Sequence, residues 1–351
     1  GYDTENNIIE NITLNFTKGL LGGYYNWTVK CIDSANNSGY SETRFINITD
    51  PDLAVYSSDI EFSKENPVEN EEVIINATIH NIGNDNATNV VVQFFEDGPY
   101  TNQIGGNIYI NLSVGENSIV NTTWTAKVGL YNIYVVVDPP YETNGSIQEL
   151  DESNNVANKT IFIPAYHTYY GGVIANLLLT SASDEYILSW FNETNINGNI
   201  YLADADSSIN WTSLFAIGTD LGYNSAQDDF EEIDTALNLT GLTDSINNSY
   251  TENEEIKAND SFAVYGNTIN NVPIVNSTNT SDFVTGILWD YSDVNPGEYN
   301  GSQDLVFVTK VNQNKQGMYG IYDYEIKVPA NLKRYVTPNN KNTVTFYVEL
   351  S

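Results

Sequence analysis

The chain has 351 residues, of which 41% are hydrophobic and 12% aromatic, so it has enough apolar material for folded cores and the length of two or three domains. Its formal net charge is −33. A surface this acidic repels nucleic-acid phosphates and anionic lipid headgroups, so we expect neither as a partner. One Cys and two His argue against a structural zinc site and against a Cys-His or Ser-His catalytic centre.

Asn-x-Ser/Thr sequons are unusually frequent. The chain holds 19 of them, whereas random placement of the same Asn, Ser and Thr residues gives about 8. Such triplets accept N-linked glycans in secreted proteins. The excess therefore predicts a glycosylated protein at the cell surface or outside the cell. The predicted glycan sites are Asn11, Asn15, Asn26, Asn36, Asn76, Asn86, Asn111, Asn121, Asn144, Asn158, Asn192, Asn210, Asn238, Asn247, Asn276 and Asn300.

The phase of these asparagines along alternating runs is a second signal. Strand side chains alternate between two faces. Asn76, Asn111 and Asn121 each lie opposite the apolar residues of their run, where a glycan has room. Asn47 is an exception, because it shares its phase with Phe45. Polar side chains face solvent in any case, which explains the phase but not the excess of sequons.

In chain order, the alternating runs 11–17 and 24–32 come first, separated by a Gly-rich turn. Three motifs lie in or after the second run: Gly23-Tyr24-Tyr25-Asn26-Trp27-Thr28-Val29, Asp33-Ser34-Ala35-Asn36-Asn37-Ser38-Gly39 and Arg44-Phe45-Ile46. With these motifs, residues 1–50 resemble the C-terminal part of a bacterial or archaeal Ig-like β-sandwich. About half of such a domain is present, so we expect its other strands to lie upstream in a parent polypeptide or to come from a neighbouring subunit. Cys31 lies in phase with the apolar residues of its run, which predicts a buried thiol.

Residues 51–163 predict a complete β-sandwich. Pro51 cannot donate a ladder hydrogen bond and marks the boundary. Short strands at this spacing, separated by turn clusters, are typical of a sandwich. The seven alternating runs are 53–56, 73–80, 89–95, 107–112, 118–125, 130–137 and 156–163.

Five motifs follow one another in the same segment. They are Asp52-Leu53-Ala54-Val55, Ala77-Thr78-Ile79-His80-Asn81-Ile82-Gly83, Trp124, Val135-Val136-Val137-Asp138 and Ile147-Gln148-Glu149-Leu150-Asp151-Glu152-Ser153-Asn154-Asn155. In this order they resemble a known family, CARDB, the cell-adhesion-related Ig-like domain of bacterial and archaeal surface proteins. The resemblance implies an extracellular modular protein and supplies no catalytic residue.

Residues 164–351 predict a larger β-rich domain of unknown type with one or two short helices. One helix is expected near 225–241, where Phe230, Ile233 and Leu237 fall on one face. Ser225 can cap its start and Gly241 can end it. The strand-like runs are 173–179, 185–191, 262–265, 283–289, 305–311, 321–328 and 343–349.

Calcium is the one cofactor that the sequence suggests. Asp204 and Asp206 are alternate residues of a polar turn and could converge on one Ca²⁺, although an Asx-type turn explains them as well. For Glu149, Asp151 and Glu152 we favour a solvated or turn-stabilising role.

The chain as a whole is therefore predicted to be mainly β, with tandem Ig-like β-sandwiches followed by the larger β-rich domain. No apolar run reaches the roughly 18 residues that a membrane helix needs. We expect a non-enzymatic structural component of an archaeal cell surface, an S-layer-type lattice or fibre subunit that contacts copies of itself or neighbouring surface proteins.

The alternative is an adhesin or carbohydrate-binding module. In that case Tyr166, Tyr169 and Tyr170 could stack on extracellular sugar, although packing explains them equally.

Overall fold

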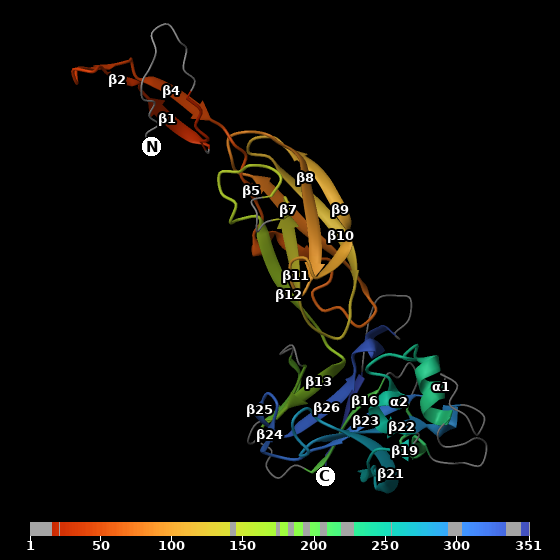
Figure 1. The fold of residues 1–351 in the computed structure, drawn as a ribbon. Coiled ribbons are helices and arrows are strands. Elements are labelled where there is room, and N and C mark those ends of the chain that lie inside the picture. Colours follow the sequence, from red (N-terminus) through yellow and green to blue (C-terminus); the bar gives the residue numbers. More distant parts are fainter. Residues whose placement is uncertain are drawn as a thin grey trace. The chain divides into compact units, whose positions relative to one another are not determined.

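The computed structural model describes residues 16–20, 22–140, 145–172, 176–181, 186–191, 197–203, 209–218, 228–253, 255–293, 304–334 and 345–350. Most of them lie in antiparallel strands (Figure 1). The chain divides into two compact units. The first comprises Gly1–Glu65, Glu72–Thr125 and Leu130–Ile161, and the second comprises Asn66–Glu71, Ala126–Gly129 and Phe162–Ser351.

The first four strands form two small sheets. β1 (Gly23–Trp27) pairs with β4 (Arg44–Ile48), and β2 (Lys30–Ile32) pairs with β3 (Ser38–Tyr40). The apolar residues of these strands are not covered by a second sheet among the described residues, and Trp27 is 46% exposed. The prediction of a buried thiol at Cys31 is therefore wrong, because Cys31 lies on the exposed β2.

All seven runs predicted between residues 51 and 163 are strands. One further short strand, β6, was not predicted. The strands are β5 (Leu53–Ala54), β6 (Ile60–Phe62), β7 (Glu72–Asn81), β8 (Ala87–Glu96), β9 (Asn102–Leu112), β10 (Asn117–Thr125), β11 (Gly129–Val137) and β12 (Val156–Ile163). A 3₁₀ turn, η1 (Ser57–Asp59), precedes β6.

These strands form two four-stranded sheets. One has the order β10-β7-β5, with β6 also paired to β7, and the other has the order β12-β11-β8-β9. The inward side chains of β7 alternate strictly with outward ones, so every second residue is buried. The core contains Leu53, Val73, Ile75, Ala77, Ile79, Val90, Val92, Phe94, Ile133, Val135 and Val137.

The turn after β7 shows why Asn81 and Gly83 occur there. The Asn81 side chain is buried and donates hydrogen bonds to the carbonyl oxygens of Asp85, at 2.8 Å, and Leu112, at 3.2 Å. It thereby satisfies backbone groups that the turn leaves outside the ladder. Gly83 lies against the backbone of Pro51 and Asp52, where a Cβ atom would collide.

The second unit contains a four-stranded sheet, β15-β14-β13-β26, and a seven-stranded sheet, β20-β21-β22-β23-β16-β27, in which β17 also pairs with β22. Two short hairpins, β18-β19 and β24-β25, accompany them. The strands are β13 (Tyr166–Gly171), β14 (Asn176–Ser181), β15 (Tyr186–Phe191), β16 (Gly198–Ala203), β17 (Leu214–Ala216), β18 (Thr251–Glu252), β19 (Glu255–Ile256), β20 (Asn259–Val264), β21 (Asn267–Asn276), β22 (Val284–Asp290), β23 (Leu305–Lys310), β24 (Lys315–Gly317), β25 (Gly320–Tyr322), β26 (Tyr324–Pro329) and β27 (Thr345–Leu350).

The centre of the seven-stranded sheet is buried on both faces. Leu202 of β16 packs in a cluster with Phe230, Ile233 and Ile326. Its neighbour Tyr201 points the other way, into a cluster with Phe262 and other residues of the opposite face. Strands buried on both faces read as continuous apolar runs, and β16 and β23 fit that description.

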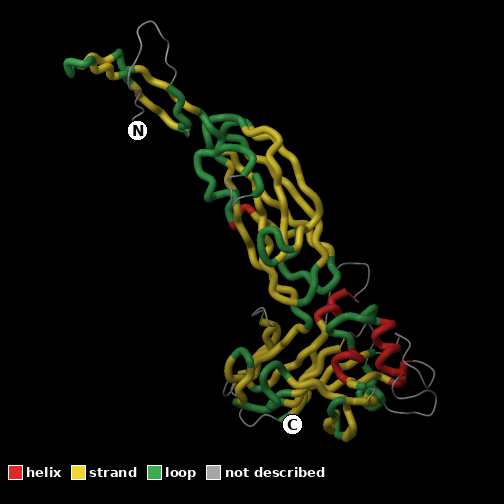
Figure 2. Tube along the Cα trace, viewed as in Figure 1, coloured by secondary structure: helices red, strands yellow, loops and turns green. Residues whose placement is uncertain are grey.

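Two helices cover part of the second unit (Figure 2). α1 (Asp228–Ala236) confirms the predicted helix, since Phe230 and Ile233 are buried. Ser225, its predicted cap, lies outside the described residues. α2 (Ile246–Tyr250) is capped at its start by Ser245, whose hydroxyl accepts a hydrogen bond from the backbone amide of Asn248. In the described part of the chain, no helix is long and apolar enough to cross a membrane.

Candidate functional site

The sequon asparagines that the structure describes all reach solvent. None is buried; Asn76, Asn158 and Asn247 are half-buried and the others are exposed. Asn47 is exposed as well, despite its phase. Four asparagines are buried among the described residues, and all four lie outside sequons: Asn81, Asn155, Asn199 and Asn331. The predicted sites Asn11, Asn15, Asn144, Asn192 and Asn300 lie outside the described residues.

The suggested calcium ligands Asp204 and Asp206 also lie outside the described residues. Elsewhere, within the described ranges, no group of three or more His, Cys, Asp or Glu side chains is placed to hold a metal ion.

The loop before β12 is held by buried carboxylates. Glu149 accepts hydrogen bonds from the backbone amide of Leu53 and, at 2.9 Å, from the side-chain amide of Asn155. Burial raises the pKa of Glu149 to about 8, against the effect of these two donors, and the nearby Glu152 and Asp138 add to the rise. Glu149 thus stabilises the loop as expected, but as a buried group that reaches the first strand of the sandwich.

Asp138 closes the other end of the same loop. Its carboxylate accepts hydrogen bonds from the backbone amides of Ser146, at 2.8 Å, and Ile147, at 2.6 Å. Across the sandwich, the indole of Trp124 donates to the buried Glu96 carboxylate at 2.7 Å. Asp138 and Glu96 are themselves buried, and these hydrogen bonds satisfy their carboxyl oxygens within the fold.

The family model for CARDB matches residues 50–159. Those residues form a CARDB domain. The sequence motifs that suggested it are the ones whose side chains hold the sandwich together: Asn81 and Gly83 at the turn after β7, Trp124 on β10, and Asp138 and Glu149 around the loop before β12. A CARDB domain is a cell-surface, adhesion-related module.

Three solved structures are similar to this part of the chain. The crystal structure of the CARDB domain of the PF1109 protein from Pyrococcus furiosus, in complex with di-metal ions, shares 24% identity with a TM-score of 0.28, over 32% of this chain and 89% of that one. The solution structure of the same domain shares 23% identity with a TM-score of 0.29, over 33% of this chain and 98% of that one. The solution structure of GmR58A from Geobacter metallireducens shares 29% identity with a TM-score of 0.25, over 30% of this chain and 91% of that one. The comparison with curated proteins gives no match.

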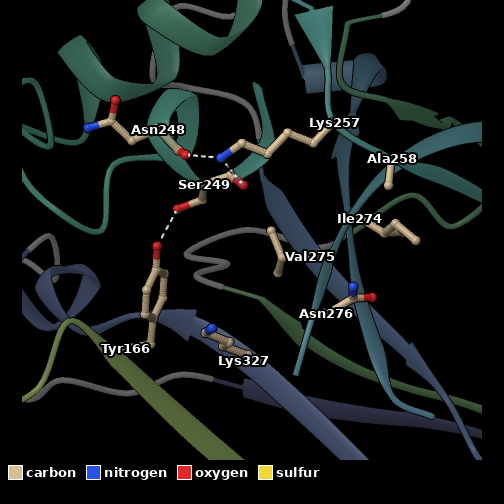
Figure 3. A pocket seen from close by; sticks show the side chains of 9 residues that line it. All are labelled: Tyr166, Asn248, Ser249, Lys257, Ala258, Ile274, Val275, Asn276 and Lys327. Carbon is tan, nitrogen blue, oxygen red and sulfur yellow. Dashed lines mark hydrogen bonds between the residues drawn. The ribbon is translucent and has the colours of Figure 1, made fainter. Parts of the chain in front are cut away.

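Outside the CARDB domain, the second unit holds a cavity of about 370 Å³ (Figure 3). Three parts of the fold form its walls: Tyr166 and Lys327 on the paired strands β13 and β26, Asn248 and Ser249 on α2, and residues 274–276 on β21. Lys257 and Ala258, which lie between β19 and β20, complete it.

Hydrogen bonds fix the polar side chains at one end of the cavity. The hydroxyls of Tyr166 and Ser249 lie 2.9 Å apart. The Lys257 ammonium donates to the carbonyl oxygens of Asn248, at 2.6 Å, and Ser249, at 3.3 Å. These carbonyls belong to the last turn of α2, where a cation is favoured. Lys327 lies with its ammonium 4.3 Å from the centre of the Tyr166 ring.

The three tyrosines considered for sugar stacking do not form one platform. Tyr166 lines the cavity, whereas Tyr169 packs edge-on against Phe346 and Tyr170 stacks on Tyr319. The sequence did not reveal the cavity, because its walls come from segments up to about 160 positions apart. The sequence held one indication of the cavity. Basic residues are rare in this chain, which has 13 of them and 46 acidic residues, and two of the basic residues, Lys257 and Lys327, line the cavity.

Proposed function

We propose that the protein is a non-catalytic structural component of an archaeal cell surface, N-glycosylated and assembled into an S-layer-type lattice or an extracellular fibre. The observation that carries the proposal is the solvent exposure of the sequon asparagines, in a chain that contains a surface-adhesion module. A glycan needs a solvent-facing asparagine, and the described sequons meet that requirement.

Sequons also lie on the edge strands of the CARDB domain. β10 and β9 are edges of the two sheets, and they carry Asn121 and Asn111, both exposed. β12, the opposite edge of the second sheet, carries the half-buried Asn158. An open strand edge invites pairing with another chain, and a bulky glycan hinders it. We infer that copies of the protein meet at surfaces other than these edges.

Strand exchange between copies is a specific form of the fibre hypothesis. In this form, the run 343–349 would complete the half-domain at residues 1–50 of a neighbour. In the structure, β27 is paired along its length with β16 of its own chain. Donation would therefore require this pairing to break, and the lattice form of the proposal has no such requirement.

Electron microscopy of purified native protein tests the proposal. We expect ordered sheets or fibres, whose repeating unit matches one copy of the chain. A monodisperse population of single particles at every concentration and salt condition would contradict assembly and leave the adhesin as the better account. The cavity of the second unit favours that second candidate, because a binding module needs a concave site lined with polar groups.

A further inference from the structure

The cavity of the second unit has a charge opposite to that of the chain. The whole sequence carries a formal charge of −33, yet the ionisable side chains that line the cavity are Lys257, Lys327 and the neutral Tyr166. Clefts focus the field of the charges that line them. The local field in the cavity therefore favours an anion, although the surrounding surface does not.

Lys327 has no hydrogen-bond acceptor for its ammonium among the described residues. Its ammonium lies over the ring of Tyr166 and is attracted electrostatically by Glu325 on the same strand, and its backbone amide donates to the Thr285 hydroxyl at 2.8 Å. Burial lowers the pKa of the half-buried Lys327, and the attraction to Glu325 offsets this only in part. A half-buried ammonium with three free N–H groups beside a cavity is suited to a negatively charged oxygen ligand.

The other hydrogen-bond donors around the cavity can be assigned. Ser249 donates its hydroxyl proton to the Ser245 carbonyl at 2.6 Å, so the Tyr166 hydroxyl donates to Ser249. Tyr166 is consequently an acceptor toward the cavity. Lys257 uses two N–H groups on α2 and keeps a third. The exposed Asn276 side chain adds an amide that can both donate and accept.

The remaining lining suits an organic ligand rather than a simple ion. Ile274, Val275 and Ala258 are apolar, and the volume of about 370 Å³ lies in the range of small-molecule pockets. A carboxylate would pair with Lys327, hydroxyl groups would bond to Asn276 and the Tyr166 oxygen, and C–H groups would meet the apolar wall. Lys327 is the one lining ammonium that makes no hydrogen bond to the described residues, and a single ammonium balances the single charge of a carboxylate.

We propose that this cavity binds an acidic monosaccharide, with the carboxylate of a uronic acid held by the Lys327 ammonium and its hydroxyl groups held by the polar side chains around it. This inference goes beyond the structural function proposed above, which does not depend on it. Asn276 is also a sequon asparagine, so a glycan attached there and a free sugar would compete for the same opening.

Binding of glucuronate to the full-length chain tests the proposal. The reference protein carries Thr278→Ala, which removes the sequon and leaves Asn276 itself unchanged. Titration calorimetry is done with glucuronate, with glucose as the sugar without a carboxylate, and with propionate as the carboxylate without hydroxyls. We expect glucuronate to bind and the other two to bind at least about tenfold more weakly, because glucose has no carboxylate for the Lys327 ammonium and propionate has no hydroxyl groups for the polar side chains.

Two lysine variants locate the site. Lys327→Met keeps the aliphatic stem and removes the ammonium, so the Kd for glucuronate should rise by about tenfold or more. Lys310→Met, in the same unit but outside the cavity lining, is the control and should leave the Kd unchanged. Thermal melting checks that both variants fold. Equal binding of glucose and glucuronate, an unchanged Kd in Lys327→Met, or no binding of millimolar glucuronate would each overturn the proposal.

Discussion

Glu149 links two parts of the CARDB domain that are far apart in sequence. Its carboxyl group accepts a hydrogen bond from Leu53, 96 positions earlier, and another from Asn155. The sequence correctly suggested a role in the turn for Glu149, but the contact with β5 depends on the tertiary fold and has no local signature. The two amide donors stabilise the carboxylate less than burial destabilises it, so the pKa is raised to about 8.

The raised pKa predicts a pH dependence of stability. The folded domain keeps the Glu149 proton up to about pH 8, whereas the unfolded chain loses it near the ordinary value of 4.5. The stabilising contribution is therefore complete below pH 4.5 and decreases as pH rises toward 8, by at most about 1.4 kcal/mol per pH unit. Urea unfolding between pH 5 and 8 measures it. Glu149→Gln should flatten this slope, while exposed Glu61→Gln should retain it; equal slopes in both variants would contradict the assignment.

Trp124 gives a second prediction for a single residue. Its indole is 4% exposed and donates to the buried Glu96 carboxylate. Trp124→Phe keeps an aromatic ring but removes this donor, and we expect a loss of about 1–3 kcal/mol in the free energy of unfolding from the hydrogen bond alone. Trp27→Phe is the matched control, since Trp27 is 46% exposed. Similar losses for the two variants would show that the buried hydrogen bond contributes little.

Cys31 shows where alternation fails as a guide to burial. The period of two correctly identifies which side chains share a face of a strand, but a face is buried only if another layer covers it. In the described part of residues 1–50, the strands form two-stranded sheets and Cys31 stays exposed. The predicted run 24–32 is also divided between β1 and β2, which belong to different sheets, so Cys31 does not share a strand with Trp27.

At the scale of elements, β7 allows a test of packing with adjacent residues. Ile75 is fully buried, whereas its neighbour Ile74 is 45% exposed on the other face. Ile75→Ala should cost about 2–5 kcal/mol, as is typical for truncation of a buried aliphatic side chain. Ile74→Ala should cost less than about 1 kcal/mol. Chemical denaturation measures both, and comparable losses would mean that the alternation of β7 does not define the core.

Two kinds of pattern led to correct predictions. The strands of the CARDB domain have one buried face and alternate, and α1 presents Phe230 and Ile233 on one side. β23 is buried on both faces and was predicted from its apolar run 305–311, whereas the similarly buried β16 was missed. β21 was missed because its polar, Asn-rich first half resembles a loop, and its pairing with β20 and β22 decides its conformation.

At the scale of the whole molecule, the sequence predicted a mainly β chain and recognised the CARDB domain, because the motifs of that family hold its turns and core. The cavity of the second unit could not be predicted in this way. Its two lysines lie 70 positions apart, on a strand and on the connection between two others, and they meet only in the folded unit. The residues of such a binding site come together only in the folded protein, so their spacing in the sequence does not reveal the site.

The central claim, that this is a glycosylated surface protein, is tested most directly by glycopeptide mass spectrometry of the native protein. We expect N-linked glycans on exposed sequons, including Asn111 and Asn121 at the edges of the CARDB sheets, and bare side chains at the buried Asn81 and Asn155 outside sequons. The peptides that contain the buried asparagines are the control. Unmodified peptides at every exposed sequon would contradict the claim.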